Sequence, residues 1–257
     1  MKRIFAASAM LVFCGSSLAT TTSLFSSFQP KGFYLGGGVG DRFNKVSGNS
    51  YLDTGEGWPD DLYSNQSISD KFYGFLSAGY TWQRSENWLP SYSVGLRYMY
   101  MPSAKIAGYL DQYSLSEFRN YNYSLDVQLL SLLAVAKIDL YQWHHVKPYV
   151  LVGAGVTTYT TTNYSEQALS DVTARVSPAF EDGSGNNIAY QAGIGLDYEV
   201  TPNLVLNLEY NYMSDGWVNT GKGANYSTLT GTNYDNESIK SKLSATSLFL
   251  GMTYYIG

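Results

Sequence analysis

Five charged residues interrupt segments of apolar and small residues, and they are the first candidates for chemistry. They are Arg97, Lys137, Asp197, Glu199 and Glu209. Carboxylates held close together can act as general acids and bases. Buried charges of opposite sign can instead pair with one another, because an unpaired buried charge is costly. Which of these applies depends on the elements that position the five side chains.

Histidine and glycine offer two further candidate sites. His144 and His145 are the only histidines of the chain, and two adjacent ligands make a poor metal site. Without another histidine, a Ser-His-Asp triad has no general base elsewhere. The run Gly36–Gly40 lacks the GxGxxG spacing of a nucleotide loop and no helix follows it. We therefore expect no catalytic, cofactor-binding or metal-binding residues, and no cofactor.

The composition excludes several classes of protein. Of the 257 residues, 14% are charged and 16% are aromatic, with 24 Tyr, 25 Gly, 1 Cys and a net charge of −5. A disordered chain is poor in aromatic residues, a disulfide scaffold needs more cysteines, and a nucleic-acid-binding protein is usually basic. The apolar runs are also shorter than the roughly 18 residues that a membrane helix requires. This composition is typical of an all-β protein and predicts no nucleic-acid partner.

The N-terminus has the pattern of a cleavable secretory signal peptide. Lys2 and Arg3 precede the short apolar stretch Ile4–Phe13, and Ser17 and Ala19 are small residues at the positions that signal peptidase reads. Cleavage after Ala19 would remove the only cysteine, Cys14, and change the net charge from −5 to −7. We therefore predict a signal peptide at 1–19, an N-terminal periplasmic segment at 20–31 and a barrel domain at 32–257.

Apolar residues recur at every second position in eight runs, which predicts eight strands. In the clearest run Leu204, Leu206, Leu208 and Tyr210 share one face. The runs are 32–40, 72–83, 92–100, 125–141, 149–159, 188–200, 204–213 and 247–256.

One of these runs, 125–141, changes phase near Leu129 and Leu130. A β-bulge would restore the alternation, so we expect one there. Asp126, a further charged residue, lies close to this change of phase.

Long and short connections alternate between the predicted strands. The long connections are 48–70, 104–123, 160–187 and 214–242, and the short ones are 85–90, 142–145 and 201–202. Soluble domains rarely contain several long structureless loops, whereas transmembrane β-barrels combine short periplasmic turns with long extracellular loops. We therefore predict an all-β, eight-stranded antiparallel up-and-down transmembrane barrel with four long extracellular loops and three short periplasmic turns.

Aromatic residues and the two strand faces agree with this topology. The apolar face carries Leu, Val, Ile and Tyr, which suits lipid, and the other face carries small and polar residues, which fit a narrow interior. Aromatic residues sit at the strand ends, as the girdles of membrane barrels do. At the short-turn side these are Trp82, Trp88 and Trp143, and at the long-loop side Tyr98, Tyr100, Tyr210 and Tyr212.

Four strand motifs and the signal peptide resemble a known family. The motifs are Gly32-Phe-Tyr-Leu-Gly-Gly-Gly, Pro148-Tyr-Val-Leu-Val-Gly-Ala-Gly, Gly193-Ile-Gly-Leu-Asp-Tyr and Phe249-Leu-Gly-Met-Thr-Tyr-Tyr. They resemble the small outer-membrane β-barrels of Gram-negative bacteria, which include OmpA-type, OmpW-like and opacity-type proteins. The resemblance implies an outer-membrane location, contact with its lipid and insertion by the barrel-assembly machinery. Family members usually end in Phe, whereas this chain ends in Tyr255-Ile256-Gly257, which bears on the efficiency of insertion.

In such a barrel the five charged residues named first face the lumen. We expect an interlocking network that plugs it, with Arg97 paired to Glu209 or Asp197, since a narrow interior must pair its charges. A gated solute path and acid–base catalysis are the alternatives.

The long loops are the predicted functional region. Tyrosine among Ser, Gly and Asn makes adaptable contact surfaces, and the candidate contact residues are Trp58, Tyr63, Tyr113, Tyr121, Trp217 and Tyr234. We predict a non-enzymatic surface protein with a structural, adhesion or antigen role, which contacts host or environmental surface molecules. The alternatives are a narrow porin-like channel or conduit for small hydrophobic solutes and, third, a lipid-modifying enzyme, for which no histidine lies at the outer rim.

Overall fold

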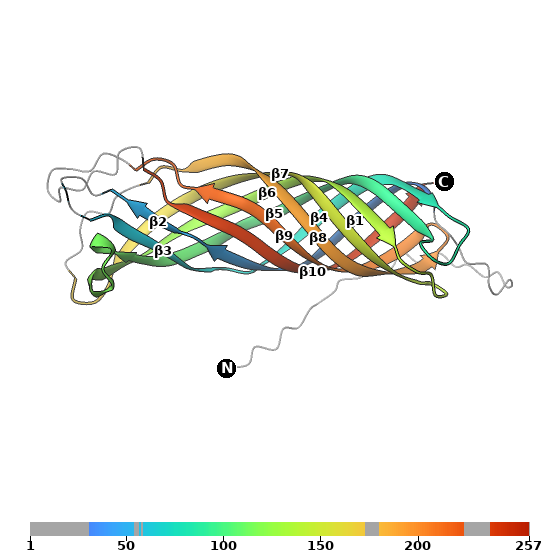
Figure 1. Ribbon diagram of the computed structural model, residues 1–257, viewed down its shortest axis with the longest axis horizontal. Helices are drawn as coiled ribbons and strands as arrows, with labels where there is room; N and C mark the ends of the chain where they lie inside the picture. Colours follow the sequence, from blue (N-terminus) through green and yellow to red (C-terminus); the bar gives the residue numbers. More distant parts are fainter. Residues whose placement is uncertain (1–30, 54–56, 58, 173–179, 224–236, 257) are drawn as a thin grey trace, which may run out of the picture.

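The chain forms one long, closed β-barrel (Figure 1). The computed structural model describes residues 31–53, 57, 59–172, 180–223 and 237–256. The strands are β1 (Gly32–Ser47), β2 (Asn49–Leu52), β3 (Asp61–Ile68), β4 (Lys71–Gln83), β5 (Ser91–Asp111), β6 (Arg119–Asp139), β7 (Val146–Ala168), β8 (Gly183–Thr201), β9 (Leu204–Asn219) and β10 (Lys240–Ile256). Two short 3-10 turns, η1 (Gln112–Ser114) and η2 (Ser116–Phe118), lie between β5 and β6. The predicted signal peptide lies outside the described residues.

Antiparallel pairing closes the ring. From β4 to β10 each strand pairs with the next along the chain, and β1 pairs with both β10 and β4. The short hairpin β2–β3 extends the sheet beyond the ends of β1 and β4. Strand β4 pairs with residues 91–100 of β5, and β3 pairs with residues 106–111 of the same strand. This confirms the predicted eight-stranded antiparallel barrel and all eight strand positions.

The strands are longer than predicted. Strands β5 and β6 contain 21 residues each and β7 contains 23, whereas a tilted strand crosses a membrane with roughly 9–11. Much of the four segments expected to be long loops is therefore strand, and the connections that remain are 53–60, 112–118, 169–182 and 220–239. The short turns lie at the opposite end, on the right in Figure 1.

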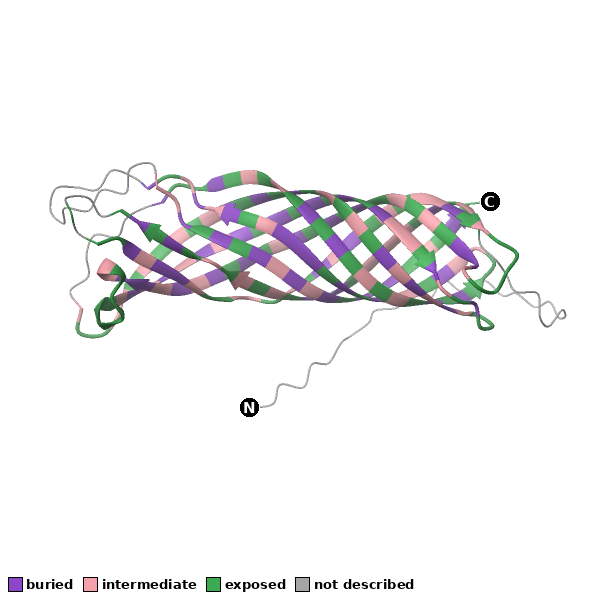
Figure 2. Cartoon of the chain, viewed as in Figure 1, coloured by how far each residue is buried: buried purple, intermediate pink, exposed green. Residues whose placement is uncertain are grey.

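An apolar belt surrounds the half of the barrel that adjoins the short turns. Side chains at alternate positions point outward there, which gives the striped burial pattern of Figure 2. The most exposed of these large apolar side chains include Phe33, Leu76, Leu96, Leu132, Ile188, Ile194, Leu250 and Ile256. We call this half the belt. It has the outward apolar surface that lipid requires.

The other half of the barrel has the opposite polarity, and we call it the projecting end. It consists of β2, β3, the upper parts of β5, β6 and β7 (103–111, 119–129 and 159–168), and the adjoining ends of β8, β9 and β10. Its interior is packed with apolar side chains, including Leu52, Tyr63, Ile106, Leu110, Tyr123, Leu125, Val127, Phe180, Val218 and Leu243. Its outer face is mostly polar, as in a soluble β-sheet protein, with Tyr51 and Trp217 among its exposed aromatic residues.

Strand β6 crosses both halves without changing its faces. Leu129 pairs with Met101 and Tyr159, and the next residue, Leu130, pairs with Tyr100 and Thr158. The expected bulge at this position is therefore wrong. Odd-numbered residues point inward throughout, and what changes at Leu129 is the face that carries the apolar side chains.

Bulges do occur elsewhere along these strands. The register of β5 shifts between Met101 and Ala104, around Pro102, which has no N–H group to donate to a sheet. Further shifts fall between Ser124 and Asp126 and between Asn65 and Ser67. Across the part of the chain that the structure describes, no helix is both long and apolar enough to span a membrane.

Candidate functional site

The lumen of the belt contains a network of lysines and carboxylates near the short turns. Lys147 Nζ lies 2.9 Å from Glu199 and 3.7 Å from Asp139. Lys137 Nζ lies 3.6 Å from Asp139 and also pairs with Asp197. We call these five residues the lower network. Two lysines thus face three carboxylates, and Asp139 lies within 4 Å of both cations.

A second ion pair crosses the middle of the lumen. Arg97 donates two hydrogen bonds to Glu209, of 2.6 and 2.9 Å, in a fork-to-fork arrangement. Glu209 also accepts from Asn211 Nδ2 at 2.8 Å and from the Tyr149 hydroxyl at 3.2 Å. The guanidinium lies 4.2 Å from the centre of the Phe75 ring. Glu209 is therefore saturated and is not free to act as a base.

A third ion pair, between Arg42 and Asp215, lies nearer the projecting end. Both side chains are buried, and Arg42 also donates to Asn44 Oδ1 at 2.7 Å. Sequence reasoning missed this pair because the first predicted strand stopped at Gly40 and Asp215 fell in a predicted loop. A signal was present, because Arg42 continues the inward alternation of Tyr34, Gly36 and Gly38.

The five charged residues singled out from the sequence all lie in the lumen, in two groups. Arg97 lies against Glu209, one of the two partners expected, and Asp197 lies against Lys137 instead. Lys147 and Asp139 complete the lower network and were missed. Asp126 points outward and accepts a hydrogen bond from Asn163, so it takes no part in the network.

Aromatic rings fill the lumen between the ion pairs. Phe75 packs edge-on against Phe249, with ring centroids 5.1 Å apart, and Tyr73 lies 4.7 Å from the same ring. Gly38 makes room for Phe75, because a Cβ atom there would come within 2.6 Å of the ring. One cavity of about 40 Å³ adjoins Arg97 and Lys137, which is space for little more than ordered water.

The histidines lie at the short-turn end and are exposed. The peptide oxygen of His145 accepts a hydrogen bond from the backbone of Glu199. No group of three or more His, Cys, Asp or Glu side chains able to hold a metal occurs among the described residues.

The predicted contact residues of the loops differ in their exposure to solvent. The predicted contact role of Tyr63 and Tyr121 is wrong, because these side chains are 0% and 4% exposed and form part of the apolar interior of the projecting end. They were placed in loops, whereas the strands continue through them and turn them inward. Tyr113 is half-buried and Trp217 is 47% exposed. Trp58 and Tyr234 lie outside the described residues.

Polar contacts hold the tip of the projecting end together. Arg119 donates to both carboxylate oxygens of Asp111, at 2.7 and 3.0 Å, and this hydrogen bonding raises the pKa of Arg119. The carboxylate of Asp61 accepts from the backbone N–H of Tyr113 at 3.0 Å. Glu237 accepts from the backbone of Asp53, and partial burial raises the pKa of Glu237.

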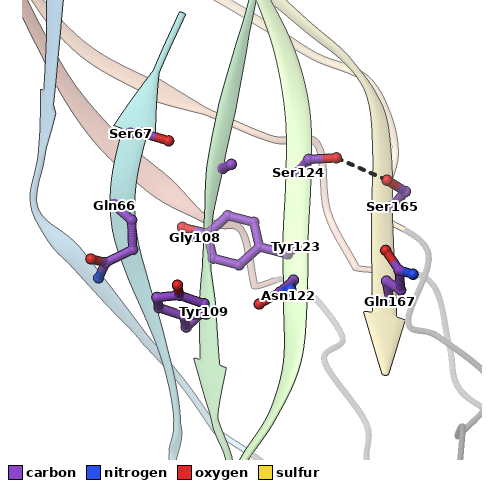
Figure 3. Close-up of a pocket in the computed structure, with 10 residues that line it drawn as sticks. Gln66, Ser67, Gly108, Tyr109, Asn122, Tyr123, Ser124, Ser165 and Gln167 are labelled. Carbon is purple, nitrogen blue, oxygen red and sulfur yellow. Dashed lines mark hydrogen bonds between the residues drawn. The ribbon is translucent and has the colours of Figure 1, made fainter. Parts of the chain in front are cut away.

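A polar concavity of about 310 Å³ lies on the outer face of the projecting end (Figure 3). It crosses strands β3, β5, β6 and β7. The residues that line it are Gln66, Ser67, Ala107, Gly108, Tyr109, Asn122, Tyr123, Ser124, Ser165 and Gln167. We call it the outer concavity. None of the ten lining residues is charged, which sets it apart from the lumen.

Comparisons with known proteins agree with this architecture. The family model of the outer membrane protein beta-barrel domain matches residues 5–245. Outer membrane protein PagN of Salmonella typhimurium is 26% identical over 133 residues, which is 52% of this chain and 52% of that protein. The match therefore spans about half the length of this relative.

Two solved structures give alignments over most of the chain. OprG from Pseudomonas aeruginosa is 15% identical with a TM-score of 0.46, and the alignment covers 90% of this chain and 99% of OprG. Neisserial surface protein A is 17% identical with a TM-score of 0.42, over 87% of this chain and 97% of that protein.

Proposed function

Because this chain belongs to the outer membrane protein beta-barrel domain family, we propose that it is a non-enzymatic surface protein whose filled barrel anchors a rigid projecting end. The protein resides in the outer membrane, where the apolar belt contacts lipid. In barrels of this class the short turns face the periplasm and the long connections face outward. The projecting end then faces the surroundings of the cell.

The observation that carries the proposal is the reversal of polarity along continuous strands. On β6 the outward residues Leu130, Leu132 and Ile138 belong to the belt, whereas Ser124 and Gln128 belong to the projecting end. A polar outer face around an apolar interior is stable in water and has no use inside a membrane. The barrel therefore extends far beyond what is needed to cross the lipid, as expected of a protein that presents a surface.

The filled lumen supports an anchoring role over a solute path. A channel needs a continuous gap, and a conduit for hydrophobic solutes needs an apolar route into the wall. The lumen instead holds three sets of paired charges together with Phe75, Tyr73 and Phe249, and the cavity beside Arg97 measures only about 40 Å³. Paired buried charges stabilise the closed form, because opening the lumen would separate them.

The projecting end has the properties of a contact surface. Antiparallel pairing holds most of its backbone in place, and binding costs less entropy when the surface is preorganised. We propose that it contacts host or environmental surface molecules through outward residues such as Tyr109 and Trp217. The buried Tyr63 and Tyr121 are not part of this surface.

Insertion is assigned to the barrel-assembly machinery. Ile256 points outward on the last strand and is 53% exposed. Its side chain belongs to the apolar belt that contacts lipid.

One set of experiments tests orientation, conduction and adhesion together. In a Cys14→Ser background, Lys240→Cys should react with a membrane-impermeant maleimide on intact cells, whereas Ser85→Cys should react only after lysis. Both side chains are exposed, at opposite ends of the barrel.

Purified protein should give no steady current steps in planar bilayers, and cells that display it should adhere to epithelial cells or matrix better than cells without it. Reversed labelling, steady conductance or equal adhesion would each overturn the corresponding part of the proposal.

A further inference from the structure

We infer that the outer concavity is a binding site for a neutral carbohydrate. This inference deepens the proposed function, since it requires the projecting end to face the surroundings. It rests on the shape of the concavity, the chemistry of its lining and the pairing of the four strands that form it.

The shape arises from small residues between larger ones. Ser67, Ala107, Ser124 and Ser165 stand side by side on β3, β5, β6 and β7, because consecutive members of this row are paired in the sheet. Next to this row Gln66, Tyr109, Asn122 and Gln167 carry longer side chains (Figure 3). The short row is therefore the floor and the long row forms a wall.

Gly108 keeps the floor in place. A Cβ atom there would approach Ser64 O to 2.2 Å and the Tyr123 ring to 2.6 Å, so no other residue fits without displacement. Tyr123 fixes its own position by donating from its hydroxyl to Asn65 Oδ1 at 2.8 Å.

Two β-bulges border the concavity and curve the sheet around it. Gln66 is the extra residue between Asn65 and Ser67, and the second irregularity lies between Ser124 and Asp126. Bulges bend strands and redirect side chains, and they are frequent beside functional sites. The concavity is thus formed by paired backbone, without contribution from a loop.

The lining matches the hydroxyl groups of a sugar. Each sugar hydroxyl both donates and accepts, and the amides of Gln66, Asn122 and Gln167 offer both functions. Among the described residues Asn122 Oδ1 is a buried atom without a hydrogen-bond partner, so the protein itself does not use the full capacity of this amide. Ser124 and Ser165 share one hydrogen bond of 3.0 Å, which leaves further capacity on both hydroxyls.

Tyr109 supplies an apolar surface for the ring face of a sugar. It is half-buried, and the guanidinium of Arg119 packs over it at 4.7 Å, which holds the ring in place. Tyrosine is well suited to this role because it combines a rigid apolar body with a polar hydroxyl.

Other classes of ligand fit less well. A phosphate or a sulfated sugar would need cations, and the lining has none; Arg119 is already paired with Asp111. A lipid chain would need apolar walls, whereas amides and hydroxyls predominate here. The volume of about 310 Å³ is at the lower end of the roughly 300–1,000 Å³ of small-molecule sites, which suits one or two sugar rings.

The test uses the full-length protein in detergent and a panel of neutral mono- to trisaccharides that includes the common hexoses and N-acetylhexosamines. A heparin-derived sulfated disaccharide is the charged comparator. Saturation-transfer NMR and calorimetry should detect at least one neutral sugar and no binding of the sulfated one. Ala107→Trp, which fills the concavity from its outer face, should abolish binding, and Asn122→Ala should weaken it about tenfold, as expected from the loss of one or two hydrogen bonds.

The matched control is Ser184→Trp, an equally large change at an exposed residue of β8 outside the concavity. It should leave binding and thermal unfolding unchanged. Binding that survives Ala107→Trp, or binding of the sulfated sugar alone, would overturn the inference. If no neutral sugar binds while displaying cells still adhere, the carbohydrate site is wrong and the proposed surface role stands; if adhesion is absent as well, both are wrong.

Discussion

The belt and the projecting end are built from the same continuous strands, yet each has the polarity of the other turned inside out. In the belt, apolar residues face outward, and ion pairs with aromatic rings between them fill the lumen. In the projecting end, apolar residues fill the interior and polar residues face outward. Antiparallel pairing runs through both, although several β-bulges lie in the projecting end, so the same type of sheet forms in lipid and in water. The surroundings decide only which of the two faces is apolar.

The two interiors also differ in what makes them stable. The interior of the belt depends on compensation of buried charges, which fails when one partner is removed. The interior of the projecting end depends on close packing of apolar side chains, which fails when a cavity is created. Single substitutions can therefore separate the two halves experimentally.

The largest effect is expected in the belt. Arg97→Ala leaves the buried carboxylate of Glu209 without its cation, and the loss of one partner of a buried pair costs about 3–5 kcal/mol. Thermal unfolding in detergent should show this loss. Arg84→Ala, which removes an exposed pair with Glu86, is the control and should change the stability little.

A double variant sharpens this prediction. Arg97→Leu with Glu209→Leu removes both charges and should recover most of the stability, because well-packed apolar residues can replace a buried pair. If Arg97→Ala left unfolding unchanged, the network would have no structural role.

The next largest effect is expected in the projecting end. Leu110 is fully buried, so Leu110→Ala should create a cavity and cost about 3 kcal/mol. Limited proteolysis of folded protein should become faster at the projecting end, while the belt stays protected. Leu250→Ala is the control, because this residue is 57% exposed on the belt and leaves no cavity. Equal effects of the two substitutions would contradict the assignment of the halves.

These two halves explain why the sequence predicts the fold well and the projecting end poorly. Alternation located all eight strands, because a half-buried strand repeats every second residue in water and in lipid alike. The prediction takes the apolar face as outward along the whole run 125–141. The apolar side chains in fact move from the inward to the outward face at Leu129, and this change of phase resembles the effect of a bulge. The alternation of apolar residues does not specify the position along each strand at which the surroundings change from lipid to water.

The same gap explains the errors in the candidate contact residues. The outward apolar alternation stops where the outer face becomes polar, and the predicted strands stop there too. Tyr63 and Tyr121 lie beyond these predicted ends and were therefore assigned to loops. Their burial depends on β3 and β6 continuing above the belt. Most lumen charges were easier to find, because a charge within an alternating run is conspicuous, although Asp139 was missed within the run 125–141. Lys147 was missed because it lies just before the run predicted to begin at Tyr149.

The position of the membrane boundary gives a third prediction. Ala134→Arg places a charge in the middle of the outward row of β6 and should cost about 2 kcal/mol or more in lipid, whereas Ser124→Arg, on the same row of the projecting end, should cost about 0–1 kcal/mol. Unfolding by denaturant in phospholipid vesicles measures both. Similar costs for the two arginines would place lipid along the full length of β6.

The smallest effect is expected at the tip, where the pH dependence has a defined sign. Burial, together with the nearby carboxylates of Asp53 and Asp60, raises the pKa of Glu237. A folded-state pKa above the unfolded value of about 4.3 means that the folded tip holds the proton more tightly. The contribution of Glu237 is therefore fully present below about pH 4 and is lost as the pH rises through the raised pKa.

Glu237→Gln should consequently remove this dependence while keeping the shape of the side chain. Hydrogen exchange of the amide of Asp53, which donates to Glu237 at 3.3 Å, reports the tip directly. After correction for intrinsic exchange, the protection of wild type relative to the variant should fall as the pH rises from 4 to 7. If the protection of the Asp53 amide changed with pH in the same way in both proteins, Glu237 would be shown to stay solvated. Since the lumen network lies far from this residue, unfolding of the belt should not distinguish the two proteins at any pH, which confines the effect to the projecting end.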